Sequence, residues 1–226
     1  MMRLRHILKF LIVICCYLPL QVVAQPVSLP ATEQFTLKNK VGRDYQIMVS
    51  LPKKQTPSKP MPVLYILDGN SVFSAFYDAK RMESDYADTL IVAVAYPTDE
   101  PFDFYRRSYD FSPSVPKEVN DPPQGGQDEF IDFLKNTLQP EIAGRYNIHQ
   151  ERQSLYGHSF GGMFALYAMY TQPTLFQHYI VSSPSLWWSH RYLMPHEKTF
   201  TKQVKAGEVS LVDKSLYLLV AEGDDV

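Results

Sequence analysis

Cysteine is almost absent from the sequence, and both cysteines lie close to its start. Of 226 residues only Cys15 and Cys16 are cysteine, and none follows Ala24. The segment after Ala24 therefore has no disulfide, no thiol nucleophile and no cysteine metal ligand. It also has neither a metal-binding spacing of His and Asp nor a glycine-rich phosphate loop, so we expect no metal and no nucleotide cofactor.

Neither sign of charge dominates the chain. There are 22 Lys and Arg residues against 24 Asp and Glu, giving a net charge of -2, and the basic residues are scattered. A nucleic-acid-binding protein usually shows a basic stripe, so this class is excluded. The length and the 45% hydrophobic content predict one globular domain over residues 25–226.

The first 24 residues have the pattern of a secretory signal peptide. Arg3, Arg5 and Lys9 precede an apolar run over residues 10–20, and small residues end at Ala24. We expect cleavage after Ala24 and a bacterial protein that is periplasmic or secreted, with no stable membrane anchor. The alternative is an uncleaved membrane anchor, but the apolar run is too short for one.

The apolar pattern after residue 34 predicts an α/β fold. Period-two alternation over residues 35–51 indicates a hairpin at the edge of a sheet. Continuous apolar runs at 62–67 and 89–95 are typical of parallel strands buried on both faces. A helical pattern over 72–86 lies between them, so the three form a right-handed β-α-β unit.

The rest of the chain continues this alternation. We expect an irregular, aromatic segment over 96–126 that packs beside the site, and a helix through 130–142 that bends at Pro140. The remaining expected elements are strands at 179–181 and 216–221, an aromatic loop at 185–194 and a helix at 198–206.

The centre of the chain has the pattern of a nucleophile elbow. Gly157-His158-Ser159-Phe160-Gly161 follows a short apolar run, and helical spacing then continues to Pro173. Serine is a weak nucleophile, so it must be held on a sharp strand-to-helix turn where a base can reach its hydroxyl. Strand, turn and helix in this order favour a reactive Ser159 over an ordinary Gly-Ser turn.

An acyl-transfer site also needs hydrogen-bond donors for the negative charge that develops on the carbonyl oxygen. After such an elbow, one donor is the backbone N–H of the residue that follows the serine, here Phe160. The other is the backbone N–H of Gly69 or Asn70, in the turn after strand 62–67. The alternative is that this turn only caps the following helix.

A base histidine is the missing part of the pattern. In α/β-hydrolases the serine is followed by an acid and then a histidine. Glu222 or Asp224 is available as the acid, but no histidine follows them. His190 or His196 would be a substitute. We therefore expect the sequence to be incomplete, lacking the last strand and helix of an α/β-hydrolase fold whose mostly parallel central sheet has helices on both faces.

Several motifs together resemble one family of α/β-hydrolases. This family is the bacterial putative esterases, which include periplasmic siderophore esterases for enterobactin-type trilactones and lie close to the esterase D group. The motifs are Tyr65-Ile66-Leu67-Asp68-Gly69-Asn70, Arg106-Arg107-Ser108-Tyr109-Asp110-Phe111-Ser112-Pro113, Gly125-Gly126, Phe130-Ile131-Asp132-Phe133-Leu134, Gly157-His158-Ser159-Phe160-Gly161-Gly162 and Ser182-Ser183-Pro184-Ser185-Leu186-Trp187-Trp188.

The resemblance implies a function and a set of site residues. Ser159 would be the nucleophile, with a C-terminal histidine as base in a Ser-His dyad more than a full triad. Arg107, Trp187 and Trp188 would border the substrate pocket, although the arginine also suits an ion pair and the tryptophans suit a core.

We therefore expect a secreted serine esterase that hydrolyses small-molecule carboxylic esters through an acyl-enzyme at Ser159, with a siderophore or a simple acyl ester as substrate. The alternatives are a non-catalytic or decayed hydrolase that lacks its base, and an acyltransferase.

Overall fold

The computed structural model describes residues 28–52 and 59–221. The chain divides into two units, Met1–Pro30 and Ala31–Val226, and of the first only residues 28–30 are described. The expected signal peptide and the candidate acids Glu222 and Asp224 lie outside the described residues. All that follows concerns the second unit.

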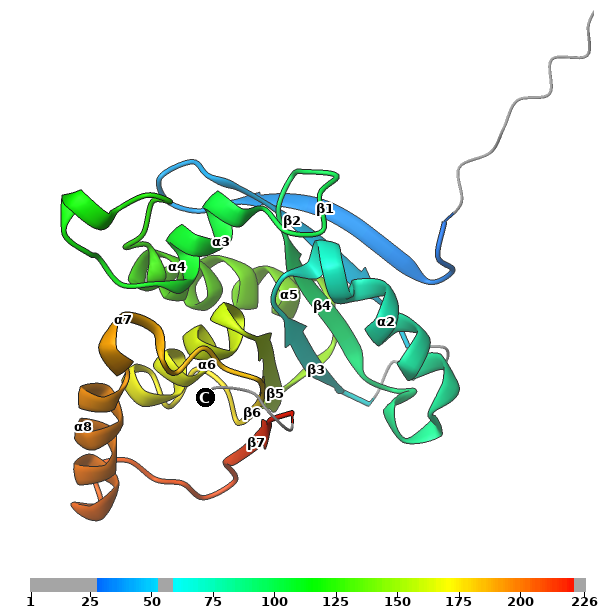
Figure 1. Cartoon of the computed structure of the whole chain (residues 1–226). Helices are drawn as coiled ribbons and strands as arrows, with labels where there is room; N and C mark the ends of the chain where they lie inside the picture. Colours follow the sequence, from blue (N-terminus) through cyan, green and yellow to red (C-terminus); the bar gives the residue numbers. More distant parts are fainter. Residues whose placement is uncertain (1–27, 53–58, 222–226) are drawn as a thin grey trace, which may run out of the picture. The chain divides into compact units, whose positions relative to one another are not determined.

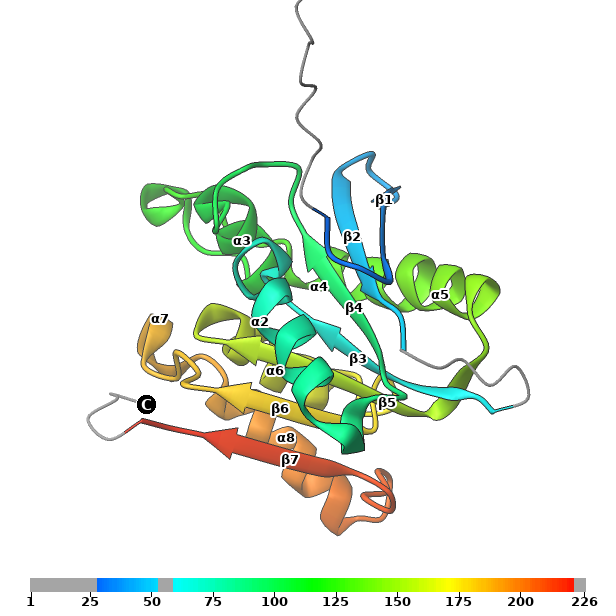
Figure 2. The same ribbon diagram turned by 90° about the vertical axis from the view of Figure 1, so that its right-hand side faces the viewer.

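Seven strands form one mixed sheet in the order β1-β2-β4-β3-β5-β6-β7 (Figures 1 and 2). The strands are β1 (Thr32–Lys38), β2 (Asp44–Ser50), β3 (Met61–Ile66), β4 (Leu90–Ala95), β5 (Ile148–His158), β6 (His178–Ser182) and β7 (Ser215–Leu219). β1 and β2 are antiparallel to each other, β2 is antiparallel to β4, and β3 to β7 run parallel. The predicted edge hairpin and β-α-β unit are both confirmed.

Helices cover both faces of this sheet. α2 (Gly69–Met82) lies on one face, and α4 (Gln127–Phe133), α5 (Gln139–Arg145), α6 (Phe160–Thr171) and α8 (Met194–Lys205) lie on the other (Figure 2). The remaining elements are α3 (Phe104–Phe111), α7 (Trp188–Arg191) and two single turns, η1 (Ser84–Tyr86) and η2 (Lys117–Val119). The sheet with helices on two faces confirms the α/β class.

Three local predictions differ in detail from the structure. The aromatic segment 185–194, predicted as a loop, contains the short helix α7. The expected bend at Pro140 takes the form of a π-helical turn, η3 (Leu134–Leu138), between α4 and α5. Pro140 has no N–H to donate to the carbonyl of Asn136, so the helix widens there. The segment 96–126 was expected to be irregular, and this is wrong for α3, because the side chain of Asp103 accepts from the N–H of Arg106 and caps a helix there.

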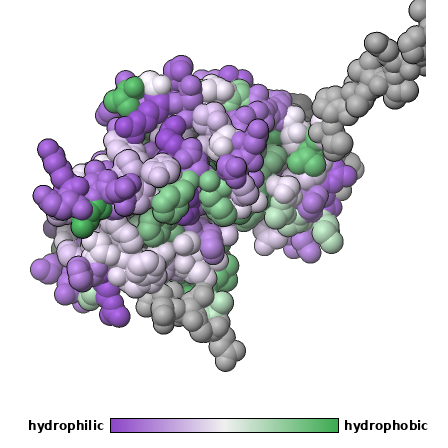
Figure 3. Space-filling view, turned by 45° about the horizontal axis from the view of Figure 1, so that its top comes forward, coloured by the Kyte–Doolittle hydropathy of each residue, from purple (hydrophilic) through white to green (hydrophobic). Residues whose placement is uncertain are grey.

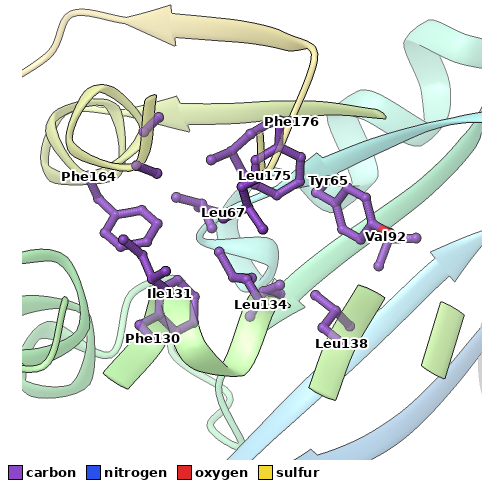
Figure 4. Packing of buried hydrophobic residues seen from close by; sticks show 14 of the residues in the cluster. Tyr65, Leu67, Val92, Phe130, Ile131, Leu134, Leu138, Phe164, Leu175 and Phe176 are labelled. Atoms are coloured by element: carbon purple, nitrogen blue, oxygen red, sulfur yellow. The ribbon is translucent and has the colours of Figure 1, made fainter. Parts of the chain in front are cut away.

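The core lies between the sheet and the helices α4 to α6. Figure 4 shows members of this cluster: Tyr65 of β3, Val92 of β4 and Leu67, which directly follows β3, together with Phe130 of α4 and Phe164 of α6. Aromatic rings dominate this layer; for example, the ring centroids of Phe130 and Phe164 lie 5.1 Å apart. Each buried large side chain contributes about 1.5–3 kcal/mol relative to an exposed one, so this layer holds the strand ends that carry the site in place.

On the face in Figure 3, hydrophobic side chains form separate groups among hydrophilic ones. Elsewhere β7, at the edge of the sheet, exposes apolar residues, with 51% of Leu218 and 59% of Tyr217 accessible. A hollow of about 1220 Å³ opens beside this edge and is lined in part by Ile180, Tyr217 and Leu219. Within the described residues, no helix is both long and apolar enough to cross a membrane.

Candidate active site

Ser159 lies on a sharp turn between the end of β5 and the start of α6. Its backbone has φ 56° and ψ -116°, a conformation that costs a non-glycine residue on the order of 1–3 kcal/mol. The turn needs a small residue at Gly157, because a Cβ there would lie 2.1 Å from the carbonyl oxygen of Gly161. The predicted strand, turn and helix around Ser159 are therefore all present.

The turn after β3 lies beside this elbow. β3 and β5 are paired in parallel, and the N–H of Leu67 donates to the carbonyl of Tyr156 at 3.1 Å. α2 begins shortly after β3, as α6 begins shortly after β5, so two helix N-termini lie at the carboxyl ends of these neighbouring strands. The turns approach closely, since a Cβ on Gly161 would lie 3.4 Å from Oδ2 of Asp68.

The three candidate donors are the first residues of these helices. Gly69 and Asn70 open α2, and Phe160 opens α6. The first N–H groups of a helix have no partner within the helix, and its N-terminus carries a partial positive charge. The arrangement can thus hold a negative oxygen above Ser159.

The turn that carries Gly69 is fixed by a buried ion pair. Asp68 has φ 54°, and its carboxylate accepts two hydrogen bonds from Arg107 of α3, both at 3.0 Å. Only 5% of the Asp68 side chain and 11% of the Arg107 side chain are exposed. The sequence suits Arg107 both as a substrate-pocket residue and as an ion-pair partner. In the structure it forms an ion pair with Asp68, the residue directly before the candidate oxyanion donor Gly69.

The side chain of Asn70 joins this turn to the loop after β4. Its Nδ2 donates to the carbonyls of Tyr96 and Thr98 at 2.9 and 3.0 Å, and its Oδ1 accepts from the N–H of Tyr96 at 2.8 Å. With its side chain occupied in this way, Asn70 offers its backbone N–H to the site. The ion pair of Asp68 and the side-chain hydrogen bonds of Asn70 thus hold residues 68–70, the donor turn, from two sides.

The two tryptophans occupy different environments. Trp188 is partly buried, and its ring meets the ring of Phe160 edge-on with centroids 5.9 Å apart. It thus packs against the residue that follows Ser159. Trp187 is 57% exposed, so its ring is open to contact from outside the chain.

Three of the five histidines in the described residues contact groups other than Ser159. Nδ1 of His178 shares a hydrogen bond of 2.8 Å with the hydroxyl of Ser215, and Nδ1 of His149 accepts from the N–H of Glu151. His196 packs edge-on against Tyr167 with ring centroids 5.0 Å apart. His158 and His190 are exposed. Among residues 28–52 and 59–221, no hydrogen bond joins a histidine to Ser159, and no three metal-ligating side chains cluster.

α3 also carries a buried charge that no sequence pattern indicated. Asp110 is fully buried, and this burial raises the pKa of its carboxyl to about 7, although Arg106 opposes the shift. Tyr45 and Tyr96 interact with the same carboxylate, and burial raises the pKa of both phenols. The guanidinium of Arg106 lies over their rings, at 4.9 and 5.2 Å from the centroids.

Known proteins resemble the chain over most of its described length. The family model described as "Putative esterase" matches residues 38–217. The siderophore triacetylfusarinine C esterase of Aspergillus fumigatus is 38% identical over 208 residues, which cover 88% of this chain and 69% of that protein. The ferri-bacillibactin esterase BesA of Bacillus subtilis is 32% identical over 212 residues, covering 87% of this chain and 71% of that protein.

Solved structures give the same result. The BES protein from Bacillus cereus matches with a TM-score of 0.78 and 30% identity, covering 89% of this chain and 92% of that one. The siderophore hydrolase EstB from Aspergillus nidulans matches with a TM-score of 0.75 and 35% identity, covering 88% and 72%. The α/β-hydrolase fold expected from the sequence is confirmed by these neighbours.

Proposed function

From the premise that the chain belongs to the putative-esterase family, we propose that it is a serine esterase that cleaves ester bonds of a siderophore through an acyl-enzyme at Ser159. The observation that carries the proposal is the backbone of Ser159, held at φ 56° between β5 and α6 beside the N-terminus of α2. Proteins store such strain where a side chain must be presented for reaction.

The proposed first step forms a bond between Oγ of Ser159 and the carbonyl carbon of the ester. A general base takes the hydroxyl proton, and the backbone N–H groups of Phe160 and of Gly69 or Asn70 hold the oxyanion. The carbon–oxygen bond to the alcohol then breaks, and the alcohol leaves with a proton. Water cleaves the acyl-enzyme by the same route in reverse, which releases the acid.

The described side chains leave the roles of the base and of the acid open. His178, His149 and His196 are held by contacts away from Ser159. The candidate acids Glu222 and Asp224 lie outside the described residues. The proposal therefore assigns the nucleophile and the oxyanion donors. It leaves the role of the base to a histidine other than these three.

The siderophore substrate is supported by two kinds of observation. Relatives that share at least 30% identity are named for siderophores, triacetylfusarinine C in one and ferri-bacillibactin in the other. On this chain, the exposed ring of Trp187 and the partly buried ring of Trp188, which packs on Phe160, offer flat apolar surfaces close to the elbow. Such surfaces suit a large acyl group with aromatic character.

The test is hydrolysis of an enterobactin-type trilactone compared with a short-chain 4-nitrophenyl ester. We expect kcat/KM to be at least about 10-fold higher for the trilactone, because one well-placed stacking or charge contact contributes about 1.4 kcal/mol. The matched control is Ser159→Ala, which should lose both activities. Equal activity of wild type and Ser159→Ala would refute the nucleophile, whereas hydrolysis of the nitrophenyl ester alone would refute the siderophore substrate.

We also propose that the protein is exported, on the support of the basic, apolar and small-residue pattern of residues 1–24. Mass spectrometry of the N-terminal peptide of the protein isolated from its cells should find Gln25 as the first residue. A peptide that retains residues 1–24 would contradict export by cleavage.

A further inference from the structure

The hydroxyl of Ser185 lies next to the reacting atom of the proposed nucleophile. Ser185 follows β6, and its Oγ is 3.2 Å from Oγ of Ser159, within hydrogen-bond distance. Only 5% of Ser185 is exposed, so water has little access to this hydroxyl. A buried hydroxyl that loses its partner is costly, which makes this contact a persistent one.

The loop that carries Ser185 is attached to the elbow on both sides. The N–H of Ser185 donates to the carbonyl of Ser159 at 3.2 Å, and the N–H of Ser159 donates to the carbonyl of Ser182 at 3.0 Å. The carbonyl of Ser185 in turn accepts from the N–H of Trp188 at 3.2 Å. The Ser185 hydroxyl therefore has a fixed position relative to Ser159.

The direction of the hydrogen bond follows from the reaction. A hydroxyl carries one proton, and Ser159 must give its proton to a base before it attacks. In the acyl-enzyme Oγ of Ser159 has no proton at all. In both states Ser159 can only accept, so Ser185 must be the donor. The negative charge passes to the carbonyl oxygen during the attack, so this hydrogen bond acts by fixing the position of Oγ.

We propose that Ser185 is a positioning residue of the site: its hydroxyl donates to Oγ of Ser159, holds the nucleophile in its attacking rotamer and leaves the Ser159 proton free for the base. The inference rests on the proposed function, since it needs Ser159 to react. The sequence offered Ser185 only as one letter of a family motif, because its contact with Ser159 joins residues 26 positions apart.

The test is the second-order rate constant for labelling by an alkyl fluorophosphonate, measured for the wild-type chain and three variants. Ser185→Ala removes the hydroxyl, Ser185→Thr keeps one, and Ser189→Ala removes an exposed hydroxyl from α7, four residues further along the chain. Loss of one hydrogen bond in the transition state predicts labelling slower by roughly 10-fold in Ser185→Ala. We expect Ser185→Thr to stay within about 3-fold of wild type and Ser189→Ala to match it.

Thermal unfolding of the same four proteins separates positioning from folding. Ser185→Ala should melt within a few degrees of wild type while labelling slowly, which a purely structural role would not produce. The inference is overturned if Ser185→Ala labels as fast as wild type, or if Ser185→Thr labels as slowly as Ser185→Ala. If the wild type labels at Ser159 in these cases, the proposed function stands and only the role of Ser185 falls. If the wild type is not labelled at all, both fall.

Discussion

At the scale of single residues, the elbow depends on the absence of a side chain at position 157. A Cβ on Gly157 would meet the carbonyl of Gly161 at 2.1 Å, a backbone atom that cannot turn away. The backbone around Ser159 must then shift, so a methyl group at position 157 should lower both the stability of the fold and the reactivity of Ser159.

We expect Gly157→Ala to lower the free energy of unfolding by about 3 kcal/mol or more, in the range of an overpacked core, measured by urea denaturation. Gly144 in α5 provides a matched control, because a Cβ there meets nothing within 4 Å. Gly144→Ala should be neutral or stabilise by up to about 1 kcal/mol. Equal stability of the two variants would contradict the packing described for the elbow.

The paired hydrogen bonds from Arg107 to Asp68 are a second feature that depends on one side chain. Lysine would keep its charge but lose one of the two hydrogen bonds to Asp68. Since both partners are mostly buried, we expect Arg107→Lys to lower the free energy of unfolding by about 1–3 kcal/mol. We also expect it to reduce kcat more than it raises KM, because the donor turn is held less firmly. Steady-state kinetics measure the split; a rise in KM with unchanged kcat would instead support direct substrate binding by Arg107.

At the scale of elements, α3 connects the sheet to the donor turn. Arg107 points from α3 to Asp68, and Asp110, one turn further along, interacts with Tyr45 of β2 and with Tyr96 after β4. Burial raises the pKa of Asp110 to about 7 from an ordinary value of 3.8. The folded state therefore favours the protonated carboxyl, so the contribution of Asp110 to stability is greatest below about pH 4 and is lost as the pH rises to about 7.

The variant Asp110→Asn should remove this pH dependence. We expect the urea midpoint of the wild type, compared with that of Asp110→Asn, to decrease between about pH 4 and about pH 7, and then to level off. Arg106, Arg43, Tyr45 and Tyr96 face the same carboxylate and remain in both proteins, so the difference isolates Asp110. Parallel pH profiles for the two proteins would contradict the raised pKa.

Strand β7 is an edge strand of the sheet in the described residues, and its side chains are exposed. Its alternating residues leave Leu216 and Leu218 toward one face and Tyr217 and Leu219 toward the other, all of them at least 40% exposed. Exposed apolar edges promote association between chains. We expect Leu218→Lys to shift sedimentation profiles toward the monomer, with the exposed helical position Lys198→Arg as a control that changes nothing.

At the scale of the whole molecule, the sequence predicted what local patterns encode. Continuous apolar runs identified the strands β3 and β4, and helical spacing of apolar residues identified the helix after Ser159, because burial on two faces or on one gives different apolar patterns. The helix α3 was missed because its capping by Asp103 is a short-range signal within an aromatic segment. The sequence predicts only a bend at Pro140, because a proline indicates a disturbed helix without indicating which form the disturbance takes.

The site was predictable only as far as it is continuous in sequence. Gly157 to Gly161 form one motif, and the turn at Gly69 follows a recognisable strand, but their adjacency depends on the pairing of β3 with β5. The contact of Ser185 with Ser159 and the choice of Asp68 as the partner of Arg107 depend on packing between distant segments. Such contacts carry no local pattern, and only the folded chain reveals them.

The central claim is that Ser159 is the nucleophile of an ester hydrolase, and intact-mass spectrometry after incubation with an alkyl fluorophosphonate tests it most directly. The account predicts that the wild-type chain gains the mass of one phosphonyl group and that Ser159→Ala gains none. A wild-type chain that stays unmodified while a control serine hydrolase is labelled, or a Ser159→Ala variant that gains the same mass, would contradict it.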